Sequence, residues 1–200
     1  MTLQGQRLGW LMAAFMFISV THGYAADFLP EPGSWQIGVR SGYSVSSRKV
    51  DMVPAHLHIG YTVFKGQWRF VPPGTLEIAA EPFASVITYV TRPDRRRGDL
   101  ELGGMFPVLT YSFDLGSVIS PYIEGGLGML YTDLRGYNLG GHFAFTEILG
   151  AGVTCFVAEN LAFTVGGRFR HVSNASLYDD NAGLNSFIAM AGISYFFSQH

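Results

Sequence analysis

The sequence predicts an all-β protein in which eight antiparallel strands close a transmembrane β-barrel. Three observations favour this fold class. Apolar and polar residues alternate along eight segments after residue 33, as expected for strands with one apolar and one polar face. The chain has 16 Phe, 10 Tyr and 25 Gly, whereas only 14% of its residues are charged. After residue 26 no segment contains the roughly 20 consecutive apolar residues that a membrane helix needs.

The first 26 residues are predicted to be a secretory signal that is cleaved. Arg7 supplies a positive charge, Leu8–Val20 is an uncharged apolar run, and Gly23–Ala26 offers small residues for cleavage. Residues 27–200 would then form one multi-pass barrel domain in a bacterial outer membrane. Without the signal, 12 basic and 15 acidic residues leave a net charge of −3, which gives no general attraction to nucleic acid.

The eight strands can be placed in order from their alternation. In the first three, the apolar series are Trp35, Ile37, Val39, Tyr43 and Val45; then Leu57, Ile59, Tyr61 and Val63; then Leu76, Ile78, Ala80, Ala84 and Val86. The other strands are expected at about 99–113, 119–132, 142–157, 161–173 and 185–197. The fourth changes phase near Pro107, as a β-bulge would cause. The eighth ends in an aromatic run, Tyr195–Phe197, typical of an outer-membrane barrel.

The polar series would fill the barrel interior. It contains Gln36, Arg40, His56, His58, Glu77, Glu81, Glu124, Arg168 and Arg170. Small barrels fill their interior with side chains, and these mixed charges can pair. We therefore expect ion pairing, rather than metal binding, for His56 and His58. A soluble barrel would reverse the pattern and leave aromatic residues such as Trp35 and Phe163 in water, which is unfavourable.

An even number of strands places both termini on the periplasmic side. The extracellular connections would then be roughly 47–55, 90–98, 133–141 and 174–184. Periplasmic turns are tight at 114–118 and 158–160, as is usual for such barrels. The link from Lys65 to Gly74 is longer than this rule predicts.

His171 and Ser173 are the candidate catalytic pair. Alternate residues of a strand share a face, so both lie on the lipid-facing side with Phe169 and at the extracellular rim. A serine becomes an effective nucleophile when an adjacent base accepts its proton, and histidine titrates near working pH. The His-x-Ser pattern is common by chance, and rim polarity is the alternative interpretation.

Two further polar residues are expected beside this pair. Matching the outward faces across the tight turn at 158–160 places Glu147 opposite His171, or two residues from that position if the register slips. A carboxylate facing lipid is unfavourable, so Glu147 either orients or charges His171 or lies at the polar interface. Asn185 would lie opposite or diagonal to Ser173, and its amide could accept a hydrogen bond from His171 Nδ1.

The segments His171–Leu177 and Asn181–Ser186 resemble the signature of PagL-type lipid A 3-O-deacylases. The resemblance implies an outer-membrane serine esterase that removes the 3-position hydroxyacyl chain of lipid A. It makes Ser173 the nucleophile and His171 the general base and acid. The oxyanion donors would be the Asn174 side chain and the Ser176 backbone amide. It implies no cofactor or metal, lipopolysaccharide as the substrate, and allows a homodimer.

Two residues depart from the family pattern. The family's orienting glutamate falls on Asn185, and a family glycine falls on Ser176. Either Asn185 orients His171 without charge, Glu147 supplies the charge, or activity is lower. Replacing the acid of a serine-protease triad by an amide costs about 10⁴ in rate.

Alternatives to this enzyme remain. One is a non-enzymatic barrel with a structural or adhesive role, and another is a lipid A acyltransferase barrel with a donor channel in its lumen. Arg95, Arg96 and Arg97, in a predicted extracellular loop, could bind lipid A phosphates, since arginine suits bidentate phosphate binding. It is equally consistent with the sequence that these arginines only lie in a solvated loop and bind no ligand. Cys155 is the only cysteine, which excludes an intramolecular disulfide, and is expected to face outward.

Overall fold

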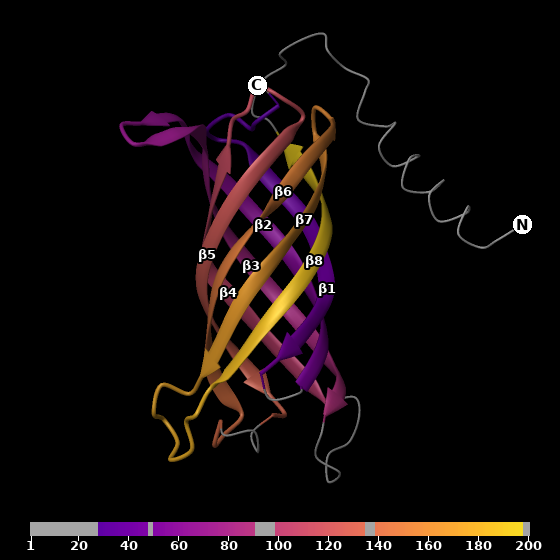
Figure 1. The fold of residues 1–200 in the computed structure, drawn as a ribbon, viewed down its shortest axis with the longest axis vertical. Helices are drawn as coiled ribbons and strands as arrows, with labels where there is room; N and C mark the ends of the chain where they lie inside the picture. Colours follow the sequence, from indigo (N-terminus) through magenta and orange to yellow (C-terminus); the bar gives the residue numbers. More distant parts are fainter. Residues whose placement is uncertain (1–27, 48–49, 91–98, 135–138, 198–200) are drawn as a thin grey trace, which may run out of the picture.

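The computed structural model describes residues 28–47, 50–90, 99–134 and 139–197. Within them, eight antiparallel strands pair in chain order and β8 closes on β1, so the predicted barrel is confirmed (Figure 1). The strands are β1 (Trp35–Ser46), β2 (Val50–Trp68), β3 (Val71–Val90), β4 (Leu100–Phe113), β5 (Ile119–Thr132), β6 (Phe143–Ala158), β7 (Leu161–Ser173) and β8 (Leu184–Phe197). No helix in this part of the chain is long and apolar enough to cross a membrane. The predicted signal, residues 1–26, lies outside the described residues.

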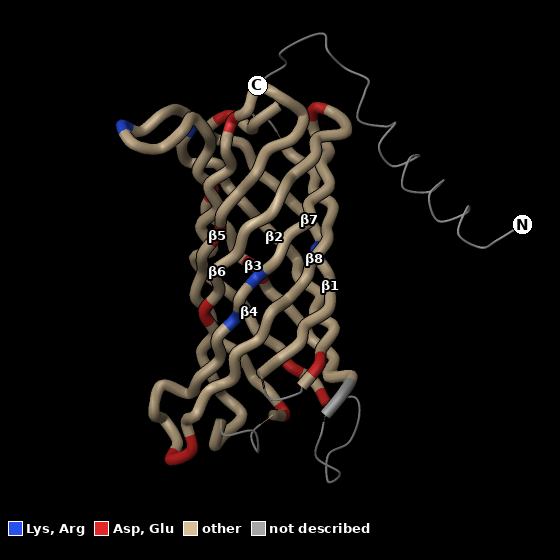
Figure 2. Tube along the Cα trace, viewed as in Figure 1, with Lys and Arg blue, Asp and Glu red and all other residues tan. Residues whose placement is uncertain are grey.

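The outer wall is apolar because the strands alternate as the sequence predicts. Exposed aromatic and aliphatic side chains include Trp35, Tyr43, Tyr61, Phe163, Val165, Phe169 and Phe187. Charged positions do occur between the two ends of the barrel in Figure 2, but the charged strand residues Arg40, Glu81, Glu124, Arg168 and Arg170 are buried inside it. Such a wall suits lipid rather than water.

The lumen is filled by a charged cluster centred on Arg168, which is 1% exposed. Its guanidinium donates to Glu81 at 2.6 and 2.9 Å and to Glu124 at 2.5 and 2.8 Å. His58 lies between Glu77 (2.8 Å) and Glu81 (2.6 Å), as the ion-pairing interpretation expects. Buried charges persist when they are paired and hydrogen-bonded in this way.

Apolar side chains close the lumen on both sides of this cluster. One group joins the extracellular ends of the strands and includes Met52, Ile87, Leu130, Val172 and Leu184. The other, at the end where β8 ends, consists of Leu29, Phe156, Ala162 and Phe196. We refer to this second end as the periplasmic end, following the topology expected from the sequence (Figure 1).

The β4–β5 pairing and the links between β1 and β2 and between β2 and β3 can be compared with the strand limits expected from the sequence. β4 pairs with β5 through a register shift between Met105 and Val108, which confirms the bulge expected near Pro107. The link predicted at 47–55 is shorter, because β2 already begins at Val50. The link predicted from Lys65 to Gly74 is wrong as a loop: β2 and β3 continue pairing through Gly66↔Gly74 and Trp68↔Val71 and form a projecting hairpin.

Candidate active site

The candidate site is a row of three polar side chains across the outer face. The register pairs Glu147 of β6 with His171 of β7, and His171 with Asn185 of β8. Side chains directly opposite on neighbouring antiparallel strands have Cβ atoms about 4.5–5.5 Å apart. The placement of Glu147 opposite His171 is as predicted, and Asn185 lies opposite His171 and therefore diagonal to Ser173.

Asn185 determines which nitrogen of His171 carries the proton. His171 Nδ1 lies 2.6 Å from Asn185 Oδ1. A carboxamide oxygen only accepts hydrogen bonds, so Nδ1 donates. The neutral ring then holds its lone pair on Nε2, the tautomer that a general base needs.

Ser173 ends β7, two residues beyond His171 on the same face. It pairs with Phe145 of β6, and both Ser173 and His171 are partly exposed. Among the described residues, the hydrogen bond of the His171 ring goes to Asn185 and none goes to Ser173. Side-chain rotation at Ser173 or His171 is therefore required to bring Oγ to Nε2, an adjustment common on substrate binding.

Gly183 is a site residue that sequence reasoning missed. Its φ is +65°, and a Cβ there would lie 2.8 Å from His171 Cε1 and 3.4 Å from Nε2. The backbone of the β7–β8 loop therefore packs against the edge of the imidazole where only glycine fits. The Asn181–Ser186 segment contains this glycine, but its contact with His171 depends on how the loop folds back.

The Asn174 side chain is not presented as an oxyanion donor. Asn174 is fully buried, and its Nδ2 donates to the carbonyls of Leu139 (2.9 Å) and Asp180 (2.7 Å). Its backbone N–H donates to Asn181 Oδ1 at 2.9 Å. In this conformation Asn174 joins the β5–β6 and β7–β8 loops, whereas the family resemblance implies an oxyanion donor at this position. Leu139 is distant in sequence and Asp180 lies in a loop, so no local sequence pattern predicts that the Asn174 amide donates to their carbonyls.

Ser176 lies at the exposed start of the β7–β8 loop, just after Ala175. Both residues have positive φ, +50° for Ala175 and +66° for Ser176. Non-glycine residues in this left-handed region carry about 1–3 kcal/mol of strain and cluster at functional sites. The conformation also explains why a glycine fits the position of Ser176 in the family pattern.

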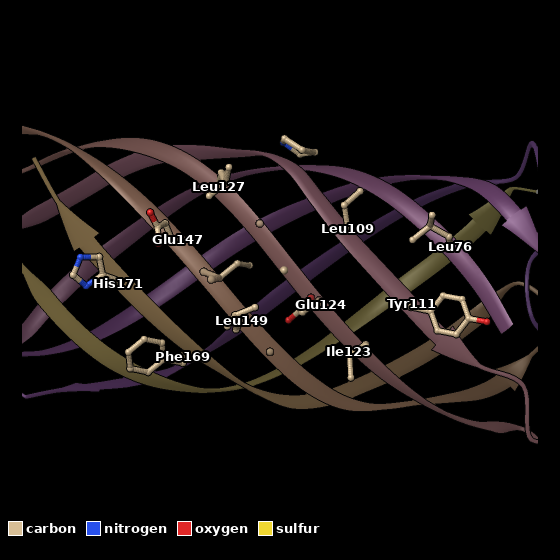
Figure 3. A pocket seen from close by; sticks show the side chains of 15 residues that line it. Leu76, Leu109, Tyr111, Ile123, Glu124, Leu127, Glu147, Leu149, Phe169 and His171 are labelled. Atoms are coloured by element: carbon tan, nitrogen blue, oxygen red, sulfur yellow. The ribbon is translucent and has the colours of Figure 1, made fainter. Parts of the chain in front are cut away.

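An apolar groove of about 760 Å³ runs along the outer wall beside this row (Figure 3). Glu147 and His171 lie at one end and Tyr111 at the other. Gly125 faces outward between its partners Leu109 and Leu149, and its missing side chain deepens the middle of the groove. The apolar lining comprises Leu76, Leu109, Ile123, Leu127, Leu149 and Phe169.

The remaining sequence candidates lie away from this site or outside the described residues. Arg95, Arg96 and Arg97 fall within residues 91–98, which the structure does not describe. Cys155 is a partly exposed free thiol in β6 and pairs with Phe163.

Solved structures with the same fold include an enzyme and a surface protein. The crystal structure of the outer membrane enzyme PagL matches with a TM-score of 0.58 and 24% identity, over 78% of this chain and 97% of that one. The structure of Neisserial surface protein A (NspA) matches with a TM-score of 0.58 and 17% identity, over 82% of this chain and 96% of that one. Identities this low establish the barrel fold alone.

Sequence comparison is more specific. The lipid A deacylase PagL of Pseudomonas aeruginosa is 36% identical over 84 residues, which cover 40% of this chain and 46% of that protein. The match thus spans about half the length of that relative. The family model described as lipid A 3-O-deacylase (PagL) matches residues 84–194, more than half of the chain and the whole of the candidate site. The chain therefore belongs to the PagL family of lipid A 3-O-deacylases.

Proposed function

We propose that the chain is an outer-membrane serine esterase that hydrolyses the 3-position hydroxyacyl ester of lipid A. The single observation that carries this proposal is the hydrogen bond from His171 Nδ1 to Asn185 Oδ1, at 2.6 Å. It leaves Nε2 as the base on a lipid-facing strand that also presents Ser173. Family membership supplies the substrate class.

The reaction would proceed through an acyl-enzyme. Ser173 Oγ attacks the ester carbonyl carbon while His171 Nε2 takes the hydroxyl proton. The tetrahedral intermediate collapses, the sugar oxygen leaves, and His171 returns the proton to it. A water then attacks the acyl-Ser173 ester with His171 again as base, which releases the fatty acid and restores the serine. No metal or cofactor takes part in these steps.

The oxyanion would be stabilised mainly by backbone at the start of the β7–β8 loop. We assign this role to the Ser176 N–H, because the Asn174 amide donates to Leu139 and Asp180. Asn174 then acts by holding the loop in shape. A donor aimed at the developing charge is worth about 10²–10³ in rate.

Asn185 and Glu147 together would perform the two functions of a triad carboxylate: Asn185 orients the imidazole, and Glu147 supplies negative charge. An amide replacing the acid is harmful when it stabilises the wrong tautomer, but here the Asn185 oxygen faces Nδ1 and favours the right one. Glu147, directly across on β6 and exposed toward lipid, would supply the negative charge that stabilises the imidazolium. Its position explains a carboxylate that would otherwise be unfavourable on a lipid-facing wall.

The outer groove would receive an acyl chain. It begins at His171 and is lined by leucine, isoleucine and phenylalanine side chains, a chemistry suited to a fatty acyl chain. In contrast, lumen cavities among the described residues measure about 30 and 10 Å³. Such cavities hold a few waters at most, which favours hydrolysis over acyl transfer from a donor bound in the lumen.

Three further expectations accompany this proposal. The apolar wall and the family support a location in the bacterial outer membrane, with lipopolysaccharide as the partner. The arginines at 95–97 would contact lipid A phosphates. A homodimer rests on the family resemblance alone.

The proposal is tested with purified protein and lipopolysaccharide in detergent. Release of a hydroxy fatty acid should be lost in Ser173→Ala and in His171→Ala. Ser41→Ala is the matched control, since Ser41 is a serine of the β1 wall whose hydroxyl donates to the Pro54 carbonyl. Equal fatty-acid release by all four proteins would sink the mechanism. No release by any folded form would favour the non-enzymatic barrel.

A further inference from the structure

The hairpin between β2 and β3 extends beyond the barrel wall at the periplasmic end. The β1–β2 pairing reaches only Trp35↔Tyr61, and the β3–β4 pairing reaches only Gly74↔Phe113. β2 nevertheless continues to Trp68 and turns at residues 69–70. Within the described part of the chain, residues 67–73 therefore pair with no strand outside the hairpin. In Figure 1 the hairpin projects sideways from the barrel wall.

Local structure fixes the direction of this hairpin. Two register shifts, at Thr62/Phe64 and at Gly66/Trp68, bend its strands, since β-bulges increase local twist and re-aim a strand. At its base the Tyr111 hydroxyl donates to the Pro72 carbonyl at 2.7 Å. The Asp114 N–H donates to the Pro73 carbonyl at 2.8 Å. The hairpin is thus held to β4 and not free to swing.

The tip exposes aromatic side chains. Phe70 is 89% exposed and Trp68 is 45% exposed. Trp68 stacks on Phe64 and on Tyr111, with ring centroids 5.1 and 5.8 Å apart. Tyr111 lines the end of the outer groove, so the aromatic surface of the hairpin continues the lipid-facing wall.

A cation accompanies the aromatic tip. Arg69 is exposed in the turn, and its guanidinium carbon lies 5.4 Å from the centroid of the Phe70 ring. Arginine binds phosphate through two parallel hydrogen bonds. Aromatic rings with an adjacent arginine are the chemistry of a membrane interface, where ring and charge lie at headgroup level.

We infer that the β2–β3 hairpin is an interfacial anchor that lies in the phospholipid leaflet at the periplasmic end. Phe70 and Trp68 enter the ester and upper acyl region, and Arg69 contacts lipid phosphate. A large apolar side chain is more stable out of water, so insertion explains an otherwise unfavourable Phe70. Continuity with the lipid-facing wall favours lipid over a soluble protein partner. The inference rests on the membrane barrel and is independent of the proposed esterase.

The first test places a nitroxide label at the tip. The label is attached at Phe70→Cys in a Cys155→Ala background, in vesicles of phosphatidylethanolamine and phosphatidylglycerol. The matched control is Glu159→Cys, in the exposed β6–β7 turn at the same end. At position 70, oxygen dissolved in lipid should relax the label more than an aqueous nickel chelate does. At position 159 the order should reverse.

Two results at position 70 would overturn the anchor. The label could be as accessible to the nickel chelate as the label at 159, which would mean that the tip lies in water. Alternatively it could be immobilised and shielded from both relaxants, which would indicate a protein contact.

A conservative variant guards against a folding defect. Phe70→Trp keeps the aromatic tip and adds emission that can be isolated by subtracting the parent spectrum. That added emission should be blue-shifted and quenched by brominated phospholipids. Added emission at the wavelength of tryptophan in water, quenched by acrylamide but not by brominated lipid, would contradict the inference.

Discussion

Asn185 Oδ1 accepts a hydrogen bond from His171 Nδ1 at 2.6 Å, across a directly opposed pair of β7 and β8. In the proposed mechanism this contact takes the place of the carboxylate–imidazole pair of a conventional triad. Asn185→Ala removes one orienting hydrogen bond, worth about 0.5–1.5 kcal/mol, and should lower kcat about tenfold. Asn185→Asp restores an acceptor and adds charge, so it should retain activity or exceed the parent. Fatty-acid release from lipopolysaccharide measures both. Equal activity in Asn185→Ala and the parent would remove Asn185 from the site.

Glu147 is expected to act through charge rather than through a hydrogen bond. Glu147→Gln preserves size and removes the negative charge beside His171, so kcat should fall about tenfold, which is about 1.4 kcal/mol. The effect should grow in Asn185→Ala, because the two residues support the same ring and neighbouring contributions are not additive. A double-mutant cycle on kcat measures the coupling. Strict additivity would mean that Glu147 and Asn185 act independently, and an unchanged kcat in Glu147→Gln would mean that Glu147 lies at the polar interface without a catalytic role.

Gly183 should be sensitive to a single methyl group. Gly183→Ala places a Cβ 2.8 Å from His171 Cε1 at a residue whose φ is +65°. The matched control is Gly116→Ala, with φ of +61° and nothing within 4 Å of the added atom. Both variants should lose about 1 kcal/mol of stability from backbone strain, measured by urea unfolding in vesicles. Only Gly183→Ala should also lose kcat, and equal kcat in the two would show that the contact with His171 is unimportant.

Gly125 should determine how well the groove accepts an acyl chain. Gly125→Leu adds a side chain to the middle of the groove, where the nearest atom to the new Cβ lies 3.5 Å away, an ordinary contact. Gly104→Leu is the control, because its Cβ has only Pro82 Cα within 4 Å, at 4.0 Å, and Gly104 does not line the groove. KM for lipopolysaccharide should rise several-fold in Gly125→Leu alone. Hydrolysis of a short-chain ester should be equal in both, and a parallel loss there would point to general misfolding.

Ser176 should accept glycine without loss of function. Its φ of +66° lies in the left-handed region, where an L-residue other than glycine is less stable by about 1–2 kcal/mol. Ser176→Gly should therefore stabilise the β7–β8 loop, seen as slower proteolysis between residues 174 and 183. Activity should persist, because the proposed donor is the backbone N–H. Loss of activity with a folded barrel would assign the role to the Ser176 hydroxyl.

The wall, the lumen and the register at the site were predictable from sequence. Strict alternation of side chains predicts that Phe163 and Phe169 face outward and that Arg168 faces the lumen. A shift of one residue would reverse the side of every side chain. The tight turn at residues 159–160 leaves little freedom in pairing β6 with β7, so Glu147 and His171 could be placed opposite each other.

What could not be predicted depends on contacts between loops. Asn174 binds Leu139, which is 35 residues away in another loop, and Gly183 contacts His171 only because its loop folds back. The projecting hairpin was also missed, because Pro72, Pro73 and Gly74 are typical of a turn. There, pairing of the hairpin strands overrides the local preference.

Cleavage of a lipid A ester through Ser173 is the reaction that we propose for this chain. The most direct measurement is mass spectrometry of lipid A from cells that express the chain or its Ser173→Ala variant, with both barrels confirmed in the outer membrane. We expect loss of one hydroxyacyl mass with the unaltered chain and intact lipid A with Ser173→Ala. Loss of the same mass with both would contradict the role of Ser173, and intact lipid A with both would contradict the proposed deacylation.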